Sequence, residues 1–118
     1  MDRLARVLTS LAVRYVDPDA VILFGSVAQG RARADSDVDL LIIGPFEGPF
    51  ERRGLEFREA VSEYPVALDT VFLSRREFAD QAGRPGSFVH TVSRHGRLVY
   101  IRPKVDPSFL GMPAGQEG

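Results

Sequence analysis

Cysteine is absent from this chain of 118 residues, which excludes disulfide bonds, thiolate zinc sites and cysteine nucleophiles together. An excess of charge is also lacking: 15 basic residues face 16 acidic ones, for a formal net charge of -1. No overall field therefore draws the protein toward nucleic acid or an anionic membrane. We expect neither as a partner, and any polyanion must be bound by local groups.

Long hydrophobic runs are missing as well. The N-terminus, Met1-Asp2-Arg3-Leu4, carries an acid early and leads into no long apolar stretch, so we expect neither a signal peptide nor a membrane span. The expected location is the cytoplasm. With 44% hydrophobic and 26% charged residues, the composition is typical of a globular protein of one domain.

The apolar residues predict an alternation of helices and strands. Over residues 3–15 they recur at steps of three and four, which predicts an amphipathic helix. Short apolar runs bounded by Gly, Pro or Asp predict strands at 20–24, 38–43, 66–73 and 98–101. The fold class is therefore α/β.

Further helices are expected between and after these strands. Phe50, Phe57, Val61 and Tyr64 can share one helix face, although Gly54 is a poor helix former in the middle of that segment.

Serines mark the start of the last two helices. Ser74-Arg75-Arg76-Glu77 has the form of a capping box, in which the serine and glutamate side chains bind free backbone amides. Ser87 can cap a helix that runs through Arg94.

The end of the chain differs in composition from the rest. We assign residues 1–102 to the folded domain and residues 103–118, rich in Pro, Gly and small residues, to a flexible C-terminal tail.

Three aspartates are the candidate metal ligands. Asp37 and Asp39 lie two apart at the start of a strand, so strand alternation places both carboxylates on one face. Asp69 lies inside the apolar run 66–73, where burying an unpaired charge costs several kcal/mol. If the two strands are adjacent, the three carboxylates form one pocket, and a divalent cation removes their mutual repulsion. Oxygen ligands of this kind suit Mg²⁺.

A glycine turn precedes these acids. Gly25-Ser26 follows a strand and opens a turn that ends at Gly30, where backbone amides and the serine hydroxyl could bind phosphate oxygens. Arg31 and Arg33 lie nearby as countercharge.

The whole stretch from Gly25 to Leu40 resembles the signature of the polymerase-β-like nucleotidyltransferase superfamily: Gly-Ser, then ten residues, then Asp-x-Asp. It is most similar to the minimal nucleotidyltransferases, and this resemblance covers about residues 3 to 101. The resemblance implies a nucleotidyltransferase fold, a small mixed β-sheet flanked by α-helices. It also implies two Mg²⁺ ions and ATP or another NTP as substrate, with an acceptor hydroxyl attacking the α-phosphorus.

The resemblance assigns roles to five residues. Asp37 and Asp39 would bind the metals, Asp69 would complete the site and help activate the acceptor, and Gly25 and Ser26 would hold the triphosphate. One departure is Gln29, because many relatives carry arginine at this position.

Three functions remain open. The first is transfer of a nucleotide, AMP above all, to a tyrosine of a HEPN toxin, as the resemblance to antitoxin nucleotidyltransferases implies. The second is a weakly catalytic module that neutralises a toxin by masking it, a possibility that Gln29 keeps open. The third is transfer to a small molecule such as an aminoglycoside.

Structural explanations compete for the same residues. Residues 35–39 could be a solvated acidic turn, and Asp69 could be a surface residue if its strand lies at the edge of the sheet. An EF-hand loop is disfavoured because Leu40 and Phe46 stand where it needs glycine and glutamate.

Overall fold

The computed structural model describes residues 3–25, 38–65 and 67–113. Within these ranges the strands form one four-stranded sheet in the order β3-β2-β1-β4. Its strands are β1 (Ala20–Phe24), β2 (Val38–Ile43), β3 (Leu68–Leu73) and β4 (Arg97–Ile101). Strand β1 pairs antiparallel with both β2 and β4, whereas β2 and β3 are parallel. The sheet is therefore mixed, as expected, and β3 is an edge strand.

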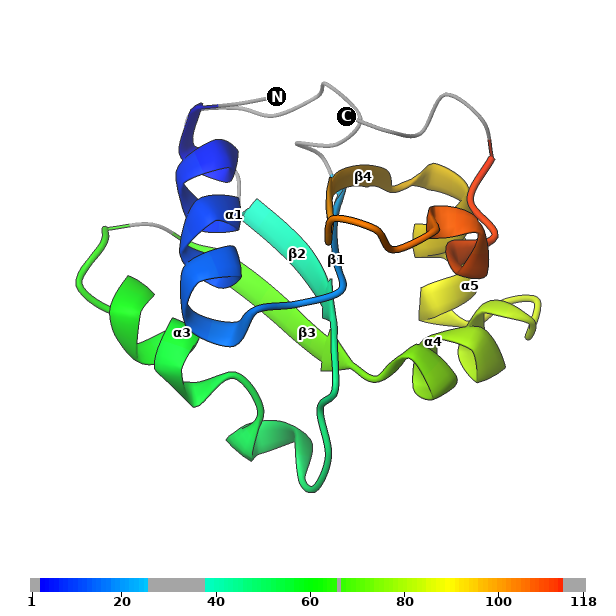
Figure 1. Cartoon of the computed structure of the whole chain (residues 1–118), viewed down its shortest axis with the longest axis horizontal. Coiled ribbons are helices and arrows are strands. Elements are labelled where there is room, and N and C mark those ends of the chain that lie inside the picture. The colour runs from blue at the N-terminus through cyan, green and yellow to red at the C-terminus, as the bar shows by residue number, and fades with distance from the viewer. Residues whose placement is uncertain (1–2, 26–37, 66, 114–118) are drawn as a thin grey trace.

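Helices cover both faces of the sheet (Figure 1). Helices α1 (Arg3–Val16) and α3 (Leu55–Val61) lie on one side, and α4 (Arg75–Ala82) and α5 (Phe88–His95) lie on the other. Alternation along β2 supplies both cores, because Leu40 and Ile42 pack with α1 and α3 while Leu41 and Ile43 pack with α4 and α5. All four of these side chains are fully buried. Among the described residues, no helix is long and apolar enough to cross a membrane.

The expected strands are all present, with small shifts at their starts. The bounds 20–24 and 38–43 agree with β1 and β2, whereas β3 begins at Leu68 instead of residue 66 and β4 begins at Arg97 instead of residue 98. The first helix extends one residue beyond the expected range, to Val16.

The single helix expected around Phe57 was wrong. The segment divides into the 3-10 helix η1 (Phe50–Arg52) and α3, which begins after Gly54. Gly54 has φ 67°, a left-handed conformation that suits glycine. A Cβ atom at this position would overlap the ring of Phe72. Both the backbone angle and the close packing against β3 therefore require glycine here, and they end one helix and start another.

Both expected serine caps are confirmed. The Glu77 amide donates to Ser74 Oγ at 3.1 Å, and the Ser74 amide donates to Glu77 Oε1 at 2.8 Å, which completes the capping box at the start of α4. At the start of α5, the His90 amide donates to Ser87 Oγ at 3.0 Å. These caps fix where the two helices of this face begin.

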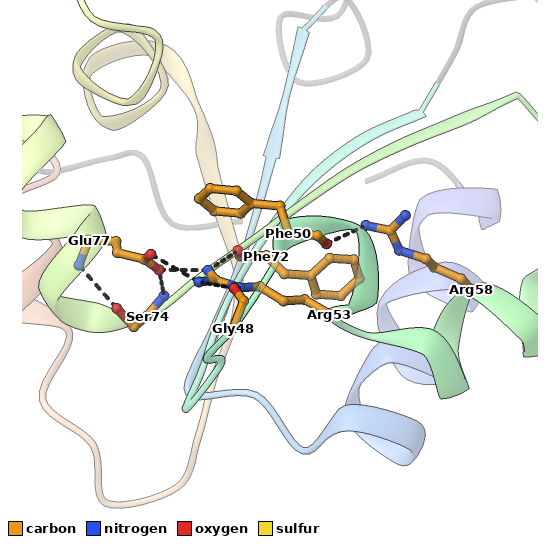
Figure 2. A network of polar contacts seen from close by, with 7 residues as sticks. All are labelled: Gly48, Phe50, Arg53, Arg58, Phe72, Ser74 and Glu77. Carbon is orange, nitrogen blue, oxygen red and sulfur yellow. Dashed lines mark hydrogen bonds and ion pairs between the residues drawn. The ribbon is translucent and has the colours of Figure 1, made fainter.

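Glu77 also binds a buried arginine, as Figure 2 shows. Arg53 is 7% exposed, and its Nη1 and Nη2 atoms donate to the two carboxylate oxygens of Glu77 at 2.7 and 3.0 Å. The guanidinium also donates to the carbonyl oxygens of Gly48 and Phe72. One side chain thus joins the loop before η1, the end of β3 and the start of α4.

This ion pair predicts a loss of stability in acid. The hydrogen bond from Arg53 lowers the pKa of Glu77 from 4.5 to about 2, against the opposing effect of burial. Because the folded pKa is the lower one, the stabilisation is complete above about pH 4.5 and is lost as the pH falls toward 2. Chemical denaturation at a series of pH values should show this loss in the wild type and a weaker one in Glu77→Gln. The exposed residue Glu47 offers a matched control, Glu47→Gln, and an equal weakening in that variant would contradict the assignment.

Part of the expected C-terminal tail contacts the core. Within residues 103–118, Pro107–Leu110 forms the 3-10 helix η2. Leu110 is 2% exposed and belongs to the same buried cluster as Phe78 of α4. An apolar residue at a suitable position can thus anchor a segment whose composition is otherwise typical of a loop.

Candidate functional site

The candidate site lies where β1 ends and where β2 and β3 begin. Asp39 pairs with Asp69 across the parallel strands, and Phe24 pairs with Asp39 across the antiparallel strands. Residues paired in this way share one face of a sheet. Phe24, Asp39 and Asp69 therefore form a row across three strands, on the face that α4 and α5 cover.

Gly25 lies against one member of this row, Asp39. It follows β1 directly and has φ 76°, in the left-handed region. A Cβ atom on Gly25 would overlap Oδ2 of Asp39. The carboxylate of Asp39 therefore lies against the backbone of residue 25, and a side chain there would displace it. The structure thus brings together Gly25, Asp39 and Asp69, which are far apart in the sequence.

The argument that drew attention to Asp69 was partly wrong. We expected its charge to be buried, but the side chain is exposed. The physical reason is that β3 is an edge strand, so water reaches its first residues. Because water reaches its carboxylate, Asp69 needs no bound cation to offset a cost of burial. It is a surface residue on an edge strand, as the competing structural explanation expected. Its significance lies instead in the register, which places it directly beside Asp39.

Two of the five expected site residues, Asp37 and Ser26, lie outside the described residues, as do Gln29, Arg31 and Arg33. Among the residues that the structure does describe, no group of three or more acidic, histidine or cysteine side chains could hold a metal ion. The described part of the site therefore offers two adjacent carboxylates. Two hard oxygen donors of like charge, side by side at a partly exposed sheet edge, fit a hydrated divalent cation such as Mg²⁺.

Sequence reasoning missed an aromatic pair beside these acids. Phe24 packs edge to face against Phe88 of α5, with ring centroids 5.2 Å apart. Phe88 is 49% exposed although it contacts the edge of the core. The place of Phe24 opposite Asp39 could be inferred once strand register is known, but the contact with Phe88 joins residues far apart in the chain and leaves no local signal.

Comparison with family models decides what kind of domain this is. The model described as "Nucleotidyltransferase domain" matches residues 4–95. The chain belongs to the nucleotidyltransferase domain family. The matched range includes every strand residue of the candidate site and most of both helical layers. The expected assignment to the nucleotidyltransferases is thereby confirmed.

Solved structures extend the likeness to three dimensions. This nucleotidyltransferase resembles a chain in the crystal structure of a mutant of the toxin–antitoxin MntA–HpeT, with 17% identity and a TM-score of 0.60, over 91% of this chain and 81% of that chain. It also matches a putative nucleotidyltransferase from Sulfolobus solfataricus, with 22% identity and a TM-score of 0.48, over 86% of this chain and 79% of that one. No curated protein gives a significant match. The first likeness confirms the expected mixed α/β fold.

Proposed function

We propose that this nucleotidyltransferase moves a nucleoside monophosphate, AMP above all, from an NTP to an acceptor hydroxyl in an Mg²⁺-dependent reaction in the cytoplasm. We further propose that the acceptor is a tyrosine of a HEPN toxin, so that the protein acts as an antitoxin. The observation that carries the proposal is the register of β2 and β3, which sets Asp39 beside Asp69 on one face.

The proposed roles follow from the chemistry of the side chains. Asp39 and Asp69, together with Asp37, would hold Mg²⁺, which supplies countercharge to the phosphates of the nucleotide. Gly25 and Ser26 would hold the triphosphate through backbone amides and the serine hydroxyl. The absence of a Cβ at residue 25 lets the Asp39 carboxylate lie against the backbone there, so a cation held by Asp39 would lie beside phosphates bound at Gly25.

Asp69 is the residue we expect to meet the acceptor. Its carboxylate is exposed on an edge strand, where a side chain of a second protein can approach. A carboxylate within hydrogen-bond reach of the acceptor hydroxyl orients it and can accept its proton. The likeness to a toxin–antitoxin structure supports a toxin as the second protein.

The test uses purified protein together with a HEPN-domain protein, chosen from the neighbouring reading frames where one of them encodes it. With α-labelled ATP and Mg²⁺, label should appear on that protein, and its toxicity should fall in parallel. Replacing the modified tyrosine with phenylalanine should remove the label, and so should EDTA or Asp39→Ala.

Two results would overturn parts of the proposal. If no labelled product forms while Asp39→Ala still neutralises the toxin, the protein acts by masking and the enzymatic function is wrong. If label passes to a small molecule and not to the toxin, the transfer reaction stands and the protein acceptor is wrong.

A further inference from the structure

An exposed aromatic ring stands at the start of α5 without an assigned role. Phe88 is 49% exposed, and its neighbour Phe24 meets it edge to face at an interplanar angle of 78°. An edge-to-face contact uses the rim of one ring against the face of the other. This geometry braces Phe88 while nearly half of its surface remains open to solvent.

The position of Phe88 is fixed by its helix. Ser87 caps α5, and its hydroxyl also donates to the carbonyl oxygen of Gln81 at 2.6 Å, which ties the start of α5 to the end of α4. The next residue, Val89, is 1% exposed and belongs to the core. A ring mounted on a capped helix with a buried neighbour loses little conformational entropy when it binds a ligand.

The aromatic pair is also next to the carboxylates. Phe24 is the strand partner of Asp39 and lies on the same face. Starting from Asp69, the row passes through Asp39 to Phe24, and the ring of Phe88 follows at a centroid distance of 5.2 Å from Phe24. A ligand that places phosphates at the acidic end of this row has an apolar ring within reach at the other end.

We propose that Phe88, braced by Phe24, is the platform on which the base of the nucleotide stacks while its phosphates lie at Gly25 and Asp39. The inference rests on the proposed function, because it takes an NTP as the ligand. Every base has a π face, so stacking on a phenyl ring adds affinity without requiring a particular sequence of hydrogen-bond donors and acceptors. This platform therefore favours the larger surface of a purine.

Another exposed phenylalanine provides a matched control. Phe50 is 54% exposed, but the guanidinium of Arg53 lies 4.2 Å from the centre of its ring. Phe50 thus belongs to the network around Arg53, which binds the carbonyl of Phe72 near the other end of β3 from Asp69. It is similar to Phe88 in size and exposure but lies away from the carboxylate row.

The first experiment measures binding of ATP and of inorganic triphosphate, both with Mg²⁺, by calorimetry. Phe88→Ala should bind ATP at least about fivefold more weakly than the wild type, the lower end of the effect of losing one stacked base. Inorganic triphosphate has no base, so its affinity should not change. Phe88→Trp should retain ATP binding, and Phe50→Ala should leave both affinities as in the wild type.

A second experiment reads the contact directly. The chain contains no tryptophan, so Phe88→Trp carries a single indole whose emission reports on what stacks against it. ATP should quench this emission and inorganic triphosphate should not. In Phe50→Trp, neither ligand should change the emission. Melting curves establish that each variant is folded before it is titrated.

The possible outcomes distinguish failure of the stacking platform from failure of the proposed function. If the wild type binds neither ATP nor another NTP, the proposed function fails. If it binds ATP and Phe88→Ala binds it equally well, with no quenching in Phe88→Trp, the function stands and the platform is wrong. If Phe88→Ala keeps its ATP affinity but loses the toxin, the ring belongs to a protein interface and the inference is overturned.

Discussion

Asp69→Asn is expected to lower the rate of nucleotidyl transfer at least about 100-fold, the scale seen when a group that stabilises transition-state charge is removed. The substitution keeps the size of the side chain but removes the negative charge beside Asp39. Under the proposed function, it would therefore weaken binding of the divalent cation and also remove the carboxylate that accepts the proton of the acceptor. Initial rates with labelled ATP at saturating Mg²⁺ measure the effect.

The same substitution should leave the metal-free fold intact. The Asp69 side chain is exposed and makes no hydrogen bond or ion pair with the described residues, so the melting temperature of Asp69→Asn should stay within the range of a surface substitution. Asp80 on α4 provides the control, because its side chain is 60% exposed and, among the described residues, forms an ion pair only with Arg84, four residues further along the chain. Asp80→Asn should transfer nucleotide at the wild-type rate. An active Asp69→Asn would remove this residue from the site.

Of the substitutions considered, Arg53→Ala should have the largest effect on stability, a decrease of about 3 kcal/mol in the free energy of unfolding. Arg53 is buried and Glu77 is partly buried, and removing one partner of such an ion pair leaves the other charge without compensation. Here it leaves the Glu77 carboxylate and the carbonyl oxygens of Gly48 and Phe72 without their shared donor. Urea denaturation measures the change.

Two variants sharpen this prediction. Arg53→Lys retains the charge but cannot reproduce the two parallel bonds to Glu77, so it should be intermediate in stability. Arg52 is the adjacent residue and is exposed, so Arg52→Ala should be close to the wild type. Equal destabilisation by Arg52→Ala and Arg53→Ala would indicate that general helix effects, and not the buried guanidinium, are responsible.

The positions of the strands followed from local sequence, but the geometry of the site did not. Apolar runs bounded by glycine, proline and aspartate placed β1 and β2 at their observed bounds. The pairing of Asp39 with Asp69 depends on β2 and β3 being parallel neighbours in one particular register. That choice is made by packing of the whole sheet, so the adjacency was a condition of the sequence argument and not its result.

The exposure of Asp69 could not be predicted from the hydrophobic pattern of its strand either. A run such as Leu68–Leu73 has the same composition in a central strand and in an edge strand, and only the strand order distinguishes them. This is why Asp69 was expected to be buried. The ion pair between Arg53 and Glu77 was missed for a related reason. Local spacing identified Glu77 as part of a capping box, whereas its second partner, Arg53, lies 24 residues away. Long-range partners leave no periodic signal.

Diffraction at the manganese absorption edge gives the most direct test of the central claim, that neighbouring carboxylates on β2 and β3 bind the catalytic cation. Crystals would be grown with Mn²⁺ and a non-hydrolysable ATP analogue, since Mn²⁺ accepts the same oxygen ligands as Mg²⁺. The account predicts anomalous density within coordination distance of Asp39 and Asp69. Density on the nucleotide but remote from both carboxylates would contradict it.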